Sequence, residues 1–270
     1  MPLSIIVCIK QVPDPESFDK ITLDPVYKTI QRSGIPVITN PADRHALEEA
    51  LRIKDETGAF VTVITMGPPQ ARKILEEALA TGADRGVILC DQAFAGADTL
   101  STACTLAGGI RFLGGYDLIL CGNETVDGAT GQVPAQLAEF LDLPHVTYAR
   151  KIDVVGKGRK AVVERILENG YLRVEVKFPA VIAVLKEINR YRLPTVMGIM
   201  EAATKEILEL GCPACESAGV DPGMMGLSGS PTRVADVFES RESRAVEMIS
   251  GEPREIAKRL VRKLHQMEAT

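Results

Sequence analysis

The stretch that decides the fold is FVTVITMGPPQARKILEEALATGADRGVILC, residues 60–90. A β-branched apolar run at 60–66 leads through the turn residues 67–69 into a helical pattern over about 70–80, and a second apolar run follows at 86–90. Two buried strands joined by one helix of this length are typical of a right-handed β-α-β unit, in which the strands lie parallel.

The same alternation extends in both directions from this unit. Upstream, an apolar strand at 3–9 precedes a helix that Asn40 can cap, that has Pro41 at its first position and that ends at Gly58. Downstream, helices are expected at about 98–112 and 130–141, with a strand at about 117–121 between them. The sequence therefore predicts an α/β fold with a doubly wound, mainly parallel sheet.

The pattern changes after about residue 145. Strand-like runs at 160–167 and 171–177 flank an Asn169-Gly170 pair, which is a strong hairpin signal, and another strand follows at 180–185. We expect these runs to extend the sheet as antiparallel strands. The remainder is expected to be peripheral, with helical character only at 252–266, so the predicted division is 1–185 for the α/β domain and 186–270 for a C-terminal extension that either lacks order or wraps a partner.

Composition and charge exclude several classes of protein. Apolar residues make up 46% and charged residues 25%, as in a globular protein, and the net charge of -5 argues against nucleic acid as the main partner. The apolar run at 3–9 has no basic residue before it, unlike a signal peptide, and no run is long enough for a transmembrane segment. We expect a cytoplasmic location, with the bacterial cytoplasm favoured over an organelle matrix. The six cysteines indicate reduced thiols rather than a disulfide framework.

Three loops are expected to meet beyond the carboxyl ends of the parallel strands, where such sheets bind ligands. They are residues 8–12, 66–69 and 122–133. The third contains three glycines and enters a helix whose N-terminus suits a phosphate, with a hydroxyl from Thr130 and an amide from Gln132. It matches neither a Gly-x-Gly-x-x-Gly nor a Walker pattern, so an ordinary strand-to-helix connection stays open as the alternative.

Two shorter motifs also have two interpretations. Asn40-Pro-Ala-Asp43 can give a ligand an amide, a carboxylate and a helix N-terminus, or it can simply cap the helix. Cys212 and Cys215 have the spacing of a redox or metal pair, but no second pair or neighbouring histidine completes a metal site, and a surface loop is expected there. The three histidines are scattered and no nucleophile elbow occurs, so the sequence favours a binding or carrier role without catalytic residues.

Many short segments, in order along nearly the whole chain, resemble the β subunit of electron-transfer flavoproteins, most closely the anaerobic, bifurcating-type branch. They include residues 7–14, 40–50, 61–68, 80–85, 93–99, 127–133, 179–183 and 226–232. The resemblance implies a heterodimer with an α subunit that provides most contacts to an electron-transferring FAD. It also implies a second adenine nucleotide in the β subunit, AMP in simple carriers and FAD in proteins that bifurcate electrons from NADH.

When the site positions of the family are carried over to this sequence, the resemblance implies that the cofactor-binding residues lie within 1–185. The set comprises Cys8, Asn40, Pro41, Ala42, Asp43, Met66, Gly122, Asn123, Glu124, Thr125, Val126, Asp127, Gly128, Ala129, Thr130, Gly131, Gln132 and Val133. FAD is favoured over AMP, although Ala129 and Gly131 depart from the pattern of the FAD-binding branch.

A dehydrogenase-docking loop at 189–200 is likewise implied, with Val196 at the position of the family's aliphatic anchor and Leu193 and Met197 beside it. The resemblance implies a flavin-dependent dehydrogenase of acyl-CoA type as partner. Three alternatives stay open: a non-bifurcating carrier with structural AMP, a stand-alone adenine-nucleotide sensor, and an adenylate-transferring enzyme.

Overall fold

The structure is a computed structural model that describes residues 2–20, 22–23, 30–31, 35–156, 158–235 and 247–268. The chain divides into two compact units, Met1–Val234 and Ala235–Thr270. The functional division at residue 185 expected from the sequence stays a prediction.

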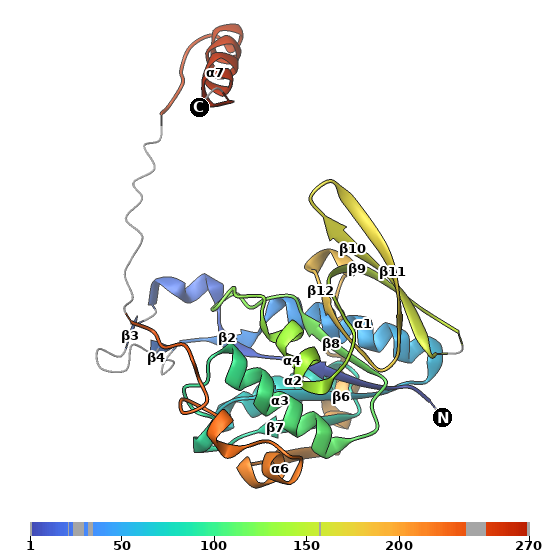
Figure 1. Cartoon of the computed structure of the whole chain (residues 1–270). Helices are drawn as coiled ribbons and strands as arrows, with labels where there is room; N and C mark the ends of the chain where they lie inside the picture. The colour runs from blue at the N-terminus through green and yellow to red at the C-terminus, as the bar shows by residue number, and fades with distance from the viewer. Residues whose placement is uncertain are drawn as a thin grey trace. The chain divides into compact units, whose positions relative to one another are not determined.

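The first unit is built around one sheet, in which the described residues form nine strands (Figure 1). Its order is β11-β10-β9-β12-β8-β1-β6-β7-β13, and all neighbours are parallel except for the antiparallel pairs β9–β10 and β10–β11. The strands are β1 Ser4–Cys8, β6 Phe60–Met66, β7 Arg85–Leu89, β8 Leu118–Gly122, β9 His145–Val155, β10 Lys160–Leu167, β11 Gly170–Lys177, β12 Ala180–Val184 and β13 Ile207–Leu210.

Helices cover both faces of this sheet. One core contains apolar side chains from α1 (Pro41–Thr57) and α2 (Arg72–Thr81), and the other contains side chains from α3 (Thr99–Leu113), α4 (Val133–Leu141) and α6 (Cys212–Ser217). A short helix, α5 (Val196–Ala202), packs against α2. The predicted doubly wound α/β architecture is therefore confirmed.

Smaller elements complete the unit. The antiparallel pairs are β2 Gln11–Pro13 with β5 Val37–Thr39, and β3 Thr22–Leu23 with β4 Ile30–Gln31; the 3-10 helices are Pro15–Lys20, Pro69–Ala71, Gln92–Phe94, Lys186–Ile188 and Pro222–Met224.

Local sequence signals located several elements well. The strand at 60–66 is confirmed, and α1 begins at Pro41 and ends before Gly58, whose φ of 71° lies in the left-handed region. The helix expected from about residue 130 begins three positions later, at Val133, because Ala129 and Gly131 both have positive φ values and cannot continue a right-handed helix.

The C-terminal third departs from expectation in three places. The Asn169-Gly170 hairpin is confirmed, but β12 is parallel to β8 and β9 and lies between them. Residues after 186 are not wholly peripheral, since β13 extends the sheet beside β7 and α6 packs against α3. The sequence missed these contacts because their partners lie far away along the chain.

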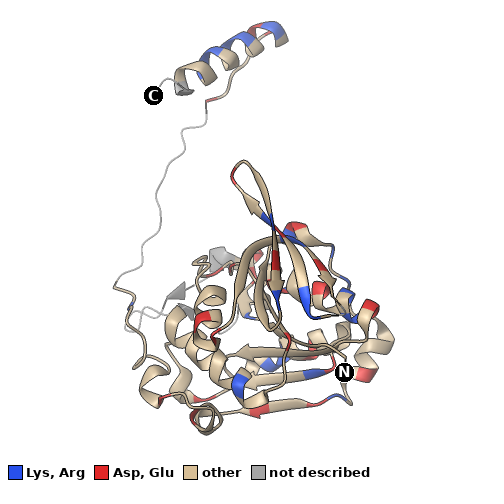
Figure 2. Ribbon diagram, turned by 45° about the vertical axis from the view of Figure 1, so that its right-hand side comes forward, with Lys and Arg blue, Asp and Glu red and all other residues tan. Residues whose placement is uncertain are grey.

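The second unit contains α7, Pro253–Glu268. Lys and Arg recur along this helix (Figure 2), and Leu260, Val261 and Leu264 are about half exposed on it. No helix in the described part of the chain is both long enough and apolar enough to cross a bilayer.

Candidate functional site

The site lies where the direction of chain winding changes. β1 and β8 are neighbours, with Cys8 opposite Cys121, yet the helices that follow β1 and β6 cover one face and those that follow β7 and β8 cover the other. Such a switch point leaves a crevice beyond the carboxyl ends of the two strands, because the flanking loops diverge there.

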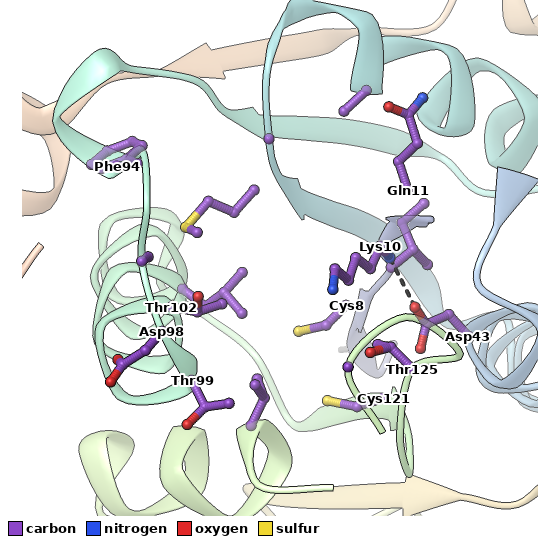
Figure 3. Close-up of a pocket in the computed structure, with 18 of the residues that line it drawn as sticks. Cys8, Lys10, Gln11, Asp43, Phe94, Asp98, Thr99, Thr102, Cys121 and Thr125 are labelled. Atoms are coloured by element: carbon purple, nitrogen blue, oxygen red, sulfur yellow. Dashed lines mark hydrogen bonds between the residues drawn. The ribbon is translucent and has the colours of Figure 1, made fainter. Parts of the chain in front are cut away.

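A cavity of about 770 Å³ occupies this crevice. Figure 3 shows Cys8, Lys10, Asp43, Thr125 and Cys121 on one side of it, and Phe94, Asp98, Thr99 and Thr102 on the other. The first wall consists of the ends of β1 and β8 with their loops, and the second consists of the loop after β7 and the first turn of α3.

The structure brings together most of the residues that the sequence placed here. The cavity is lined by Cys8, Asp43, Met66, Gly122, Asn123, Glu124, Thr125, Gly128, Thr130, Gly131, Gln132 and Val133. The lining does not include Asn40, Pro41, Ala42, Val126, Asp127 or Ala129.

Asn40 neither caps α1 with its side chain nor faces the cavity. Its fully buried side chain donates from Nδ2 to the carbonyl of Glu124 at 3.0 Å and accepts from the backbone N–H of Val126 at 3.2 Å. The capping interpretation is therefore wrong, and Asn40 instead tethers the loop that follows β8. A local pattern could not reveal this, since the loop is more than eighty residues away along the chain.

Asp43 makes a second tether from the first turn of α1. Its carboxylate accepts the backbone N–H of Lys10 at 2.8 Å and that of Gly122 at 3.0 Å, so it joins the ends of β1 and β8. Burial raises the pKa of Asp43 to about 7, against the lowering effect of these hydrogen bonds.

The start of α4 borders the cavity, which Val133 and Pro134 help to line. Gln132 forms no side-chain cap with the first turn of α4, and its Oε1 accepts a hydrogen bond from Thr99 at 2.9 Å. Thr130, Gly131 and Gln132 thus precede the helix rather than belong to it. Lys10 is the only Lys or Arg among the described residues lining the cavity, and its Nζ contacts both carboxylate oxygens of Asp127, at 2.7 and 2.8 Å.

The sequence did not assign the second wall to the site. Residues 90–99 follow β7 at the same edge of the sheet, so the strand-end rule that selected the other loops would have found them. Asp98 caps α3 through Ser101 and also accepts hydrogen bonds from the backbone and hydroxyl of Thr232. Part of the segment expected to lack order or wrap a partner, 226–232, therefore braces this wall.

The other two residue sets lie away from the cavity. Leu193, Val196 and Met197 are 72%, 77% and 63% exposed, and Ile199 and Met200 extend the same apolar surface along α5. Cys212 and Cys215 begin a short helix rather than a surface loop, and burial raises the pKa of the fully buried Cys215 to about 11. Among the described residues no group of three or more His, Cys, Asp or Glu side chains can hold a metal ion.

Comparison with known proteins decides the family. The model of the electron transfer flavoprotein domain matches residues 28–213. The chain belongs to the electron transfer flavoprotein family. Its match to the electron transfer flavoprotein subunit beta of Thermoanaerobacterium thermosaccharolyticum is 45% identical and covers 97% of this chain and 98% of the relative.

Two further relatives place the chain among the β-type electron-transfer subunits of this family. The electron transfer flavoprotein subunit beta of Clostridium acetobutylicum is 44% identical, with 98% of each chain covered. The caffeyl-CoA reductase-Etf complex subunit CarD of Acetobacterium woodii is also 44% identical, with 98% of each chain covered. The predicted resemblance to the β subunit of electron-transfer flavoproteins is confirmed.

Proposed function

We propose that this chain is the β subunit of a heterodimer that passes electrons between a flavin-dependent dehydrogenase and another acceptor. In this proposal an α subunit holds the electron-transferring FAD, and the cavity of this chain holds a second adenine nucleotide. The observation that carries the proposal is the cavity of about 770 Å³ at the switch point of a doubly wound sheet in a chain of this family.

The lining of the cavity fits an adenine nucleotide. Met66, Phe94 and Leu106 provide apolar contacts for a flat ring, and Thr99 and Thr102 add hydroxyl groups. The uncapped start of α4 offers backbone N–H groups and the positive end of the helix dipole to a phosphate. Lys10 would add a cation, and Asp127 holds its ammonium group in place.

We infer that the nucleotide is FAD rather than AMP. Ligand cavities span about 300–1,000 Å³, and this cavity lies in the upper half of that range, which favours the larger nucleotide. A bound flavin supplies hydride and single-electron chemistry, whereas this chain binds it, orients it and sets its surroundings. With FAD here, the proposal extends to bifurcation of electrons from NADH.

For the docking partner we propose a dehydrogenase of acyl-CoA type, contacted through Leu193, Val196 and Met197. Exposed aliphatic and methionine side chains suit an apolar pocket on a partner surface. The name of the Acetobacterium woodii relative, a subunit of a caffeyl-CoA reductase complex, supports an acyl-CoA substrate class. We place the complex in the bacterial cytoplasm and assign the C-terminal unit to contact with the α subunit.

The decisive experiment co-expresses this chain with its α subunit, releases the nucleotides by denaturation and counts FAD and AMP per heterodimer. Two FAD and no AMP are expected. One FAD and one AMP would exclude bifurcation at this site and leave a one-flavin carrier. One FAD alone would contradict nucleotide binding by this chain.

Two substitutions on α3 test whether the second nucleotide of the heterodimer binds in the cavity. Thr102→Trp places a large ring in the cavity and should remove one nucleotide per heterodimer. Phe112→Trp lies on the same helix at a half-exposed position outside the cavity, so it should leave the count unchanged. Equal counts in both variants would place the second nucleotide elsewhere.

A further inference from the structure

The segment that leads to the docking residues is fastened to α1 by side chains. Asn189 donates from Nδ2 to the carbonyl of His45 and to the carboxylate of Glu49, each at 3.0 Å, and its Oδ1 lies 2.9 Å from Nδ1 of His45. Tyr191 packs edge-on against the His45 ring, with centroids 5.2 Å apart. The chain is therefore attached to α1 at two positions, Asn189 and Tyr191, before it reaches Leu193.

Arg192 makes the strongest of these attachments. Its backbone N–H and its Nε both donate to Oε2 of Glu48 at 2.9 Å, and its Nη2 donates to Oε1 at 3.0 Å. The same Nη2 reaches Asp55 at 2.8 Å. The Glu48 side chain is 7% exposed, so this two-pronged, charge-assisted pair is shielded on the carboxylate side, where such bonds are strongest.

The far end of the docking segment is fixed as well. A Cβ on Gly198 would lie 2.1 Å from the carbonyl oxygen of Ala80, so α5 touches the last turns of α2 directly. Beyond α5, Lys205 donates from Nζ to the carbonyls of Leu79 and Ala83, at 3.0 and 2.8 Å. The docking segment 193–200 is thus held on α1 just before Leu193, and on α2 through Gly198 and through Lys205.

We propose that the Arg192–Glu48 pair, supported by Asn189, is a positioning unit that pre-organises the apolar docking face of Leu193, Val196 and Met197. The inference rests on the docking role proposed above. A face held in its bound conformation loses less conformational freedom when a partner binds than a mobile one does. The Glu48 and Glu49 carboxylates belong to α1. This helix is a rigid support because its Ala46, Ala50 and Leu51 side chains are buried in the core.

Loss of the Arg192–Glu48 pair should weaken binding of the partner without changing nucleotide binding in the cavity. Asn40, just before α1, and Asp43, in its first turn, hold the cavity wall. Neither contacts Arg192 through any hydrogen bond found in the described residues. Removing the Arg192 anchor releases the segment but leaves the buried face of α1 in place.

The test uses the intact heterodimer with Arg192→Met and the matched control Arg190→Met, which removes an exposed cation two positions earlier. Amide hydrogen exchange of residues 193–200 and the Kd for a purified short-chain acyl-CoA dehydrogenase are measured, together with nucleotide content. If release lowers the population of the docking-competent segment to a tenth, the Kd rises about tenfold. Exchange should quicken in the same variant, whereas Arg190→Met and the nucleotide count should match wild type.

Two further variants, Arg192→Lys and Val196→Asp, distinguish failure of the positioning role from failure of the docking proposal. Lysine keeps the charge but not the two-pronged geometry, so an intermediate Kd and intermediate exchange are expected. If Val196→Asp weakens binding while Arg192→Met changes neither exchange nor Kd, the positioning role is overturned and the docking proposal survives. If Val196→Asp leaves binding unchanged, both are overturned. Loss of nucleotide from Arg192→Met would show a general structural role and would also overturn the inference.

Discussion

Asp43 and Gly122 meet where the first turn of α1 rests on the end of β8. The backbone N–H of Gly122 donates to Oδ1 of Asp43 at 3.0 Å, and a Cβ at residue 122 would lie 2.4 Å from that oxygen and 2.7 Å from Cβ of Ala42. Glycine is therefore required by close approach rather than by an unusual φ. The contact sets the spacing between α1 and the loop that lines the cavity.

We expect Gly122→Ala to destabilise the chain and loosen the nucleotide site, because the new methyl group must push α1 away from β8. Overpacking of this kind costs about 1–3 kcal/mol in the free energy of unfolding. Thermal unfolding and nucleotide content measure the effect. Gly128→Ala is the control for thermal unfolding alone, because Gly128 itself lines the cavity. Its Cβ would meet only Thr125 Oγ1, at an ordinary 3.5 Å, so a similar loss of stability in both variants would contradict the explanation.

Asp43 should make the free energy of unfolding decrease as the pH rises from about 4 to about 7. Its pKa is about 7 in the folded chain against an ordinary 3.8, so in this range the folded state retains a proton that the unfolded state has lost. The stabilisation is complete below the lower value and is lost as the pH passes the higher one, with an upper limit of about 4 kcal/mol.

Denaturant titrations at about pH 5 and about pH 8 check this linkage in wild type and Asp43→Asn. The amide cannot ionise, so the stability of the variant relative to wild type should improve at the higher pH, whatever its absolute value. An unchanged difference between the two proteins would show that Asp43 does not titrate in this range.

Asn40→Ser should distinguish a tether from a cap. Serine is about as good an N-cap as asparagine, so the substitution would be nearly neutral if capping were the role of this residue. Because serine cannot reach both Glu124 and Val126, we expect a loss of about 1–3 kcal/mol and weaker nucleotide binding. Chemical denaturation and nucleotide content test this, and wild-type values for both would restore the capping role.

Val196→Asp should weaken dehydrogenase docking while nucleotide content stays constant. The side chain is 77% exposed, so the folded chain tolerates a carboxylate there, but an apolar pocket on a partner does not. We expect the Kd to rise at least about tenfold, which corresponds to 1.4 kcal/mol. Phe112→Asp serves as the control, because α3 covers the opposite face of the sheet from α1 and α2.

Sequence determined the elements whose signals are local. Apolar β-branched runs gave the strands at 60–66 and 180–184, and Pro41 with Gly58 gave the two ends of α1, because each depends on residues a few positions apart. The alternation of strands and helices was enough to predict the doubly wound sheet. It was also enough to predict that the loops after β1, β6 and β8 converge.

Tertiary structure alone decided how distant segments use their polar groups. Asn40 has the sequence context of a capping residue, but its side-chain amide forms hydrogen bonds with the 122–133 loop. Arg192 lies in an irregular stretch and pairs with Glu48 on α1. The position of β12 between β8 and β9, and the addition of β13 to the far edge, were likewise not visible in any local pattern. The reason is physical: a buried amide, carboxylate or strand edge must find a hydrogen-bond partner, and which partner lies within reach is fixed only when the chain has packed.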